Sequence, residues 1–119
     1  MKKDEHIESM VRLTHIKDAI KQIHEFMGDS DWKAFESHRM LQDAVHFQFA
    51  VIGEAIKYVE EEKLNKYDYP WHQVRSFRNL IVHEYFNIRI IAVWNIIKND
   101  LDELEKIINL MLKNEFGIS

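Results

Sequence analysis

The sequence predicts an all-α protein, an up-and-down bundle of four to five helices in a single domain that spans residues 1–119. Three observations predict this fold class. Apolar residues recur at steps of three and four along most of the chain, which is the spacing of one helix face. The composition has only 3 glycines and 1 proline, so little interrupts long helices. A chain of 119 residues can form one hydrophobic core and is too short for two.

The first predicted helix runs from about residue 4 to residue 27, and Gly28 follows as a natural C-cap. Its expected apolar stripe consists of Ile7, Met10, Val11, Leu13, Ile16, Ile20, Ile23, Phe26 and Met27. After Gly28, either Ser30 or Asp31 can cap a short helical turn over residues 32–35.

A second long helix is predicted from about residue 37 to residue 62. Its expected inward positions are Met40, Leu41, Ala44, Phe47, Val51, Ile52, Ala55, Ile56 and Val59. Gly53 lies within this helix, where glycine costs about 1 kcal/mol relative to alanine. We therefore expect a neighbouring helix to approach closely at Gly53. A polar connector over residues 63–69 follows.

Pro70 is suited to the first position of a third helix. This helix is expected to end near His83, because Glu84 would otherwise fall on its apolar side. That apolar side consists of Val74, Phe77, Leu80 and Ile81.

The last predicted helix begins after Asn87, a good N-cap, and runs from residue 88 to about residue 114. Its expected inward positions are Ile91, Trp94, Ile97, Leu101, Leu104, Ile108 and Met111.

Composition excludes several classes of protein. The absence of cysteine excludes disulfides and thiol chemistry. The first six residues lack the apolar segment of a signal peptide, and no apolar run reaches membrane-spanning length. We therefore expect a cytoplasmic protein with no membrane partner. The net charge of −4 argues against a surface that coats nucleic acid generally, although Arg75, Arg78 and Arg89 form a small local basic group.

The segment from residue 77 to residue 86 carries the most chemistry. Arg78 offers a planar fork for phosphate, and His83 is suited to proton transfer near neutral pH. On an ideal helix, Arg75, Arg78, Asn79 and His83 spread over the side opposite the apolar one. Asn79 lies four residues before His83 and can orient its imidazole. Arg78 and His83 are about 140° apart on a straight helix. A single helix therefore cannot bring both to one phosphate unless its end unwinds or a second copy of the helix contributes.

Each of these residues also has an ordinary structural interpretation. Taken alone, the polar residues of the third helix could be a solvated face. Glu54 could bond a neighbouring helix, or it could position Arg78. The seven histidines contain no pair spaced by three or four residues, so we expect no metal site. Trp32, Trp71 and Trp94 are expected to fill the core or an interface.

The pattern Arg78-Asn79-x3-His83-x-Tyr85-Phe86, together with Gly53-Glu54-Ala55 on the preceding helix, resembles the HEPN superfamily and most closely its HepT-like proteins. The resemblance covers nearly the whole chain. One position departs from it: Arg89 stands where an acidic residue is expected after the Phe-x-Ile turn.

This resemblance implies a helical ribonuclease that forms a homodimer and cuts RNA without a metal or another cofactor. By the same resemblance, Arg78 would hold the scissile phosphate and His83 would act as general base or acid, with Arg75, Asn79 and Glu54 in support. The partner would be a minimal nucleotidyltransferase antitoxin that adds AMP to Tyr85. Two functions therefore compete: a metal-independent endoribonuclease toxin, and a non-catalytic helical partner that delivers a substrate to the nucleotidyltransferase.

Overall fold

The structure is a computed structural model that describes residues 2–83 and 89–118; for residue 2 and residues 79–83 only the backbone is described. All regular structure in these ranges is helical, which confirms the predicted all-α class. The helices are α1 (Lys2–Met27), α2 (Trp32–Glu36), α3 (Arg39–Ile56), α4 (Glu61–Leu64), α5 (Trp71–His83), α6 (Ile90–Asn99) and α7 (Leu101–Phe116).

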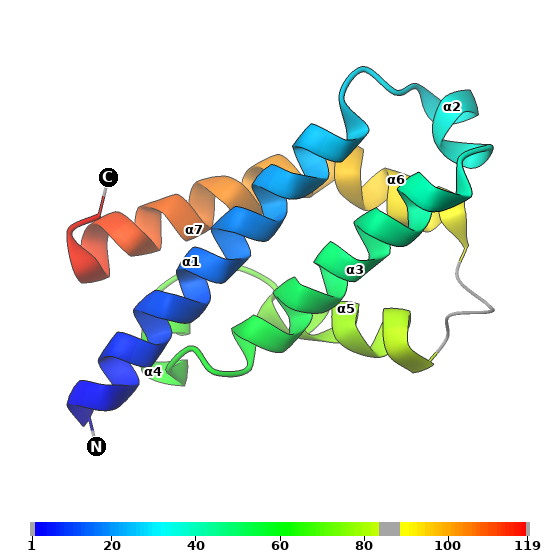
Figure 1. The fold of residues 1–119 in the computed structure, drawn as a ribbon. Coiled ribbons are helices and arrows are strands. Elements are labelled where there is room, and N and C mark those ends of the chain that lie inside the picture. The colour runs from blue at the N-terminus through cyan, green and yellow to red at the C-terminus, as the bar shows by residue number, and fades with distance from the viewer. Residues whose placement is uncertain (1, 84–88, 119) are drawn as a thin grey trace.

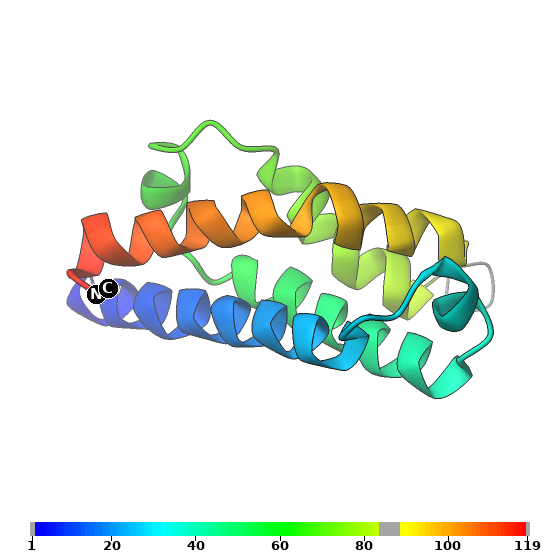
Figure 2. The ribbon, with the colours of Figure 1, turned by 90° about the horizontal axis from the view of Figure 1, so that it is seen from above.

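The long helices form two layers (Figures 1 and 2). Helices α1 and α3 lie side by side in one layer, and α5 lies with the consecutive helices α6 and α7 in the other. The closest packing is between α1 and α3 and between α3 and α5, with α7 covering α1. Helix α3 is therefore flanked by both α1 and α5, and residues of these three helices can meet at one site.

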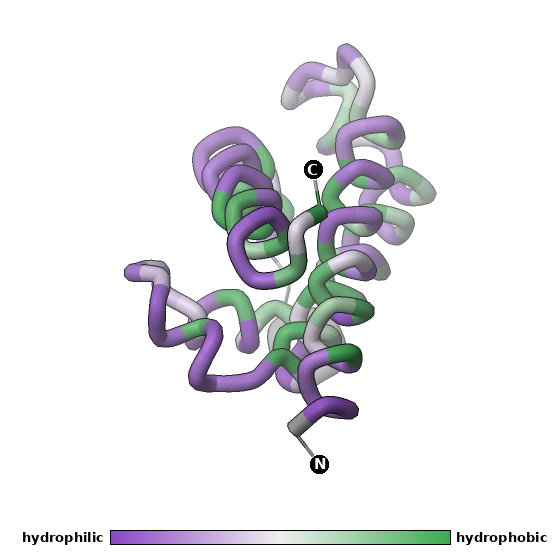
Figure 3. Tube along the Cα trace, turned by 90° about the vertical axis from the view of Figure 1, so that its left-hand side faces the viewer, coloured by the Kyte–Doolittle hydropathy of each residue, from purple (hydrophilic) through white to green (hydrophobic). Residues whose placement is uncertain are grey.

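The hydrophobic core lies between the layers, where apolar residues face one another (Figure 3). Its largest fully buried side chains come from α1, α2, α3, α4 and α7: Phe35, Leu13, Ile16, Ile20, Ile23, Ile52, Ile56, Leu64, Leu101, Leu104, Ile108 and Met111. The three tryptophans contribute as expected. Trp71 is buried and donates from Nε1 to the Leu64 carbonyl at 3.0 Å, while Trp32 and Trp94 pack edge to face at 5.8 Å.

The first two helices match their predicted signals. Gly28 ends α1 with a φ of +48°, in the left-handed region that favours glycine. Of the two candidate caps for α2, the structure uses Asp31, whose side chain accepts from the Ala34 N–H at 2.9 Å. The predicted stripe of α1 was too broad, because Ile7, Val11 and Phe26 are exposed.

Helix α3 is shorter than predicted, since it ends at Ile56 instead of continuing to residue 62. Tight turns follow, in which Tyr58 donates to the Ala55 carbonyl and Val59 to the Ile56 carbonyl. They leave Val59 buried. The short helix α4 then occupies part of the predicted polar connector.

A buried polar group accounts for this early end of α3. The Ser9 hydroxyl on α1 accepts from the Glu60 N–H at 2.9 Å, and the Glu60 carboxylate binds the buried Lys63 at 2.5 Å. This hydrogen bond with Lys63 is the largest factor that lowers the pKa of Glu60. The run from Glu60 to Lys63, predicted to be a solvated helix end, is therefore fixed against α1.

For two residues of α3 the predicted inward orientation is wrong, because Met40 is 79% exposed and Phe47 is 64% exposed. Periodicity identifies an apolar stripe, but it cannot say which part of that stripe another element covers. These two side chains leave an uncovered apolar strip on the outer side of α3.

The single last helix predicted over residues 88–114 is in fact two helices, α6 and α7, which meet at Asp100. Asn99 and Asp100 are poor helix formers, because their side chains compete for backbone hydrogen bonds. The predicted N-cap Asn87 lies outside the described residues, and Arg89 precedes α6. Most predicted inward positions are buried, but Ile91 is exposed.

The start of α1 contacts the end of α7 through two aromatic rings. The rings of His6, near the start of α1, and Phe116, at the end of α7, are 4.5 Å apart. None of the described helices combines the length and the apolar character needed to cross a membrane.

Candidate functional site

The candidate site begins where α5 crosses α3 at Gly53. A side-chain Cβ on Gly53 would fall less than 3.0 Å from the backbone nitrogen of Arg78, closer than real side chains come. The backbones of the two helices can therefore touch here only because residue 53 is glycine. This is the close approach predicted from the position of Gly53 within a helix. It brings the next residue, Glu54, beside Arg78.

Glu54 and Arg78 form an ion pair, with Arg78 Nε 2.7 Å from Glu54 Oε2. Both side chains are a little over one third exposed. On the same carboxylate, Lys57 Nζ lies 3.6 Å from Oε2 and the Tyr58 hydroxyl donates to Oε1 at 3.4 Å. Glu54 thus connects two cations and a phenol on the outer side of α3 and α5.

The pairing uses only one of the three nitrogens of the Arg78 guanidinium. Its two terminal nitrogens make no hydrogen bond or ion pair with a described residue. A guanidinium held through Nε keeps the paired edge that binds phosphate in a fork. Glu54 therefore fixes the orientation of Arg78 without occupying that edge.

A pocket of about 290 Å³ opens beside this pair, lined by residues of three helices. Helix α1 contributes Arg12 and His15, α5 contributes Arg78, and α3 contributes Phe47, Ala50, Val51, Glu54 and Ala55. The floor is largely apolar, and the charged groups stand at its sides. It can accommodate a small anionic group next to an apolar surface.

On the α1 side, Arg12 is held much as Arg78 is. Its Nε lies 2.7 Å from Glu8 Oε1, and its guanidinium lies over the Tyr58 ring at 4.3 Å. Tyr58 therefore contacts Arg12 through its ring and Glu54 through its hydroxyl. The sequence pattern does not indicate Arg12, because it is distant from Arg78 in the chain and no local spacing links the two.

Arg75, predicted to support the site, is directed elsewhere. Its Nη2 lies 2.6 Å from the Glu61 carboxylate at the start of α4, and Arg75 does not line the pocket. Asn79 and His83 are part of α5, but their side chains are not described. Tyr85 lies outside the described residues. The predicted grouping of Asn79, His83 and Tyr85 with Arg78 thus remains a prediction.

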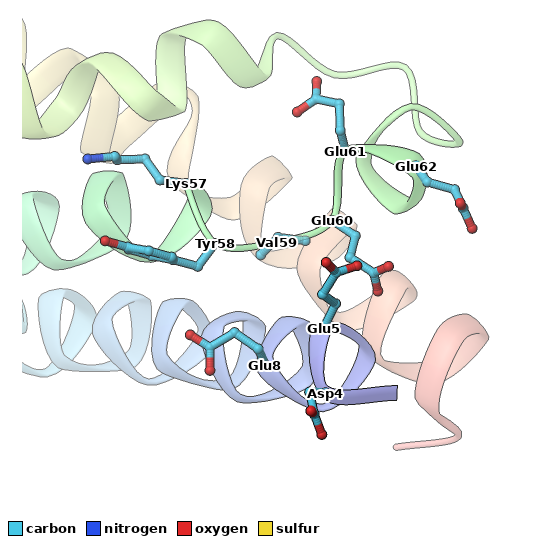
Figure 4. Close-up of a pocket in the computed structure, with 9 residues that line it drawn as sticks. All are labelled: Asp4, Glu5, Glu8, Lys57, Tyr58, Val59, Glu60, Glu61 and Glu62. Carbon is cyan, nitrogen blue, oxygen red and sulfur yellow. The ribbon is translucent and has the colours of Figure 1, made fainter. Parts of the chain in front are cut away.

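A second, larger pocket of about 710 Å³ adjoins the site and is strongly acidic (Figure 4). Its walls come from the start of α1 and from the segment after α3, and they include Lys57 and Tyr58. The carboxylates around it are Asp4, Glu5, Glu8, Glu60, Glu61 and Glu62. A phosphate is repelled from this pocket, so an anionic ligand held by Arg78 would be directed away from it.

One group among the described residues has donors suited to a metal ion: His24 on α1 with Asp102 and Glu105 on α7. Its ligand atoms lie within 4.8 Å of one another. Histidine spacing could not reveal this group, because its single histidine comes from a different helix than its carboxylates. None of the three lines the pocket at Arg78.

Comparison with known proteins gives one family and several relatives. Residues 16–111 match the family model described as Ribonuclease HepT-like. A protein of Methanocaldococcus jannaschii named "Putative RNase MJ1380" is 30% identical over 100 residues, which are 83% of this chain and 92% of that protein. "Probable ribonuclease HepT" of Thermococcus cleftensis is 29% identical over 94 residues, 78% of this chain and 86% of its own.

A longer relative, also from Methanocaldococcus jannaschii, is named "Gamma-glutamylcyclotransferase and putative RNase MJ0434". It is 34% identical over 103 residues, which are 85% of this chain and 46% of that protein. No solved structure gives a significant match.

The contact at Gly53 yields a test in which two physical effects have opposite signs. Helix propensity alone predicts that Gly53→Ala stabilises the protein by about 1 kcal/mol. The close approach of Arg78 predicts overpacking, which typically costs about 1–3 kcal/mol. We expect a net loss in the free energy of unfolding, measured by urea denaturation. A more stable Gly53→Ala protein would contradict the packing of α3 against α5.

Proposed function

We propose an RNA-cleaving function on the premise that this chain belongs to the HepT-like ribonuclease family. Specifically, the chain is a metal-independent endoribonuclease that acts as the toxin of a toxin–antitoxin pair. The observation that carries the proposal is Arg78, which lines a pocket and is held by Glu54 through Nε, while its terminal nitrogens pair with no described residue. This is the arrangement that a phosphate-binding arginine needs.

In the proposed reaction, a base takes the proton of a ribose 2′-hydroxyl, and the 2′-oxygen attacks the adjacent phosphorus. The bond from phosphorus to the 5′-oxygen breaks, and an acid gives that oxygen a proton. The products are a 2′,3′-cyclic phosphate and a 5′-hydroxyl. His83 serves as base or acid, and Arg78 stabilises the negative charge that develops on the phosphate.

The reaction needs a base and an acid, and one chain offers a single His83 in the motif. We therefore propose a homodimer in which two copies contribute Arg78 and His83 to one cleft. The exposed apolar residues Met40 and Phe47 on α3 support this assembly, since no described element covers them and Phe47 also lines the pocket. A pair related by a two-fold axis is the commonest closed assembly.

The competing function is a non-catalytic helical partner of a nucleotidyltransferase. The net charge of −4 and the acidic pocket beside the site favour it, because both oppose RNA binding in general. The two functions differ in one respect that can be measured, namely RNA cleavage by the purified protein.

The decisive experiment is incubation of the purified chain with total RNA in the presence of EDTA. Because histidine and arginine supply proton transfer and charge stabilisation, we expect cleavage to persist in EDTA. Removal of a positioned acid or base typically costs about 10²–10⁴-fold in rate, so His83→Ala should be almost inactive and still folded. Undiminished cleavage by His83→Ala, or its loss in EDTA, would refute the assignment.

The homodimer predicts a mass in solution of two chains at micromolar concentration, with an interface of about 1,200 Å² or more. Phe47→Glu places a charge in the proposed interface and should give monomers, measured by light scattering after size exclusion. Leu110→Glu is the matched control, because Leu110 is exposed on α7 outside the proposed interface, and this variant should remain dimeric. A monomeric parent protein would count against the proposal.

Tyr85 is proposed as the residue at which the antitoxin switches the toxin off. A transferred AMP would add a negative phosphate and a bulky base next to His83, repelling and blocking the RNA phosphate. Co-expression with a minimal nucleotidyltransferase should give AMP-sized mass additions that vanish in Tyr85→Phe and persist in the control Tyr58→Phe. An unmodified protein, or AMP on another residue with Tyr85 untouched, would exclude this switch.

A further inference from the structure

Arg12 on α1 and Arg78 on α5 have the same kind of support although they come from different helices. Each guanidinium is bound through Nε by a carboxylate at 2.7 Å, Glu8 for Arg12 and Glu54 for Arg78. In neither case do the terminal nitrogens form an ion pair with a described residue. Both arginines therefore keep the edge that binds phosphate in a fork.

Tyr58 joins the two arginine–carboxylate pairs. Its ring lies under the Arg12 guanidinium, and its hydroxyl donates to Glu54. Stacking on an aromatic ring restricts the plane of a guanidinium, and the Nε contact restricts its rotation. Arg12 is thereby held in one orientation on the wall of the pocket, instead of moving freely in solvent.

The local charge favours an anion at this position. The connected group contains the cations Arg12, Lys57 and Arg78 and the carboxylates Glu8 and Glu54, so it carries one net positive charge. Arg12 and Arg78 line the same pocket of about 290 Å³. An RNA strand bound at Arg78 thus has a second cation within the same small volume.

The acidic pocket restricts the direction that such a strand can take. One of its six carboxylates, Glu8, is paired with Arg12. The other five lie at the start of α1 and after the end of α3, on the side away from the Tyr58 hydroxyl (Figure 4). Repulsion keeps the phosphates of RNA away from that side. The pocket wall formed by Arg12 and His15 is not part of it and remains accessible to the strand.

We propose that Arg12 is a second RNA-binding residue, which holds a backbone phosphate of the substrate adjacent to the one held by Arg78. This inference rests on the proposed ribonuclease function and extends it to a residue of α1 outside the motif. Glu8 and Tyr58 act as positioning residues for Arg12. The contact serves binding and not proton transfer, so it affects the affinity for RNA more than the chemical step.

The test compares Arg12→Gln with Lys98→Gln. Lys98 is a matched control, because its Nζ also lies over an aromatic ring, that of Trp94 at 4.6 Å, but it does not line the pocket. Binding of a labelled single-stranded RNA of mixed sequence is measured by fluorescence anisotropy in the His83→Ala background at several salt concentrations. Loss of one phosphate contact to a single strand reduces the slope of log K against log salt by about 0.7. We expect this reduction for Arg12→Gln and no change for Lys98→Gln.

Cleavage kinetics in the active protein give a second measurement. Arg12→Gln should raise KM several-fold and leave kcat nearly unchanged, because a contact present in both ground and transition states affects binding alone. An unchanged KM and an unchanged salt slope would overturn the proposal. So would a loss of affinity that comes only with dissociation of the dimer, since Arg12 would then bind the second copy.

Arg12→Lys provides the test if Arg12→Gln does not fold. Lysine keeps the charge and loses the fork, so the salt slope should persist while the affinity falls. An affinity equal to that of the parent would overturn the role of Arg12.

Failure of this inference can be told apart from failure of the proposed ribonuclease function. A parent protein that cuts no RNA refutes the ribonuclease, whereas a parent that cuts RNA equally well without Arg12 refutes this inference alone.

Discussion

The close contact between the backbones of α3 and α5 at Gly53 is the constraint on which the rest of the site depends. A glycine within a helix weakens that helix, and here the loss is offset by packing that no other residue allows. The contact fixes the position of α5 along α3, and the T-shaped packing of Phe49 against Phe77 at 5.2 Å supports the same alignment. A shift of one residue would rotate Arg78 by about 100° away from Glu54. Core packing and site geometry are thus consequences of one contact.

The polar groups around the pocket show how a partly exposed arginine can be given a defined orientation. Surface ion pairs usually contribute little to stability, and the exposed pair of Arg78 with Glu54 is no exception. Its effect is on geometry. Glu54 occupies Nε and excludes other orientations of the guanidinium, and Tyr58 couples that carboxylate to Arg12. The energetic cost of ordering these side chains is met during folding, before any ligand binds.

The sequence predicted the features of this protein that depend on local signals. The end of α1 at Gly28 and a cap for α2 at Ser30 or Asp31 follow from capping signals over a few residues, and the structure uses Asp31. The early end of α3 depends on Ser9, which is 51 residues from Glu60, so no local pattern could reveal it. Likewise, the exposure of Met40 and Phe47 depends on which helices cover α3. Gly53, Glu54 and Arg78 could be grouped from motif and packing, whereas Arg12 required the fold.

The contact between His6 and Phe116 joins the beginning of α1 to the end of α7, in addition to the packing of these helices along their length. The terminal segments of a domain are poorly ordered unless contacts with the rest of the fold hold them in place. Here α1 lies between α3 and α7, so peeling away either end would expose core residues of the other. This linkage of α1 to both α3 and α7 favours cooperative unfolding of the whole bundle.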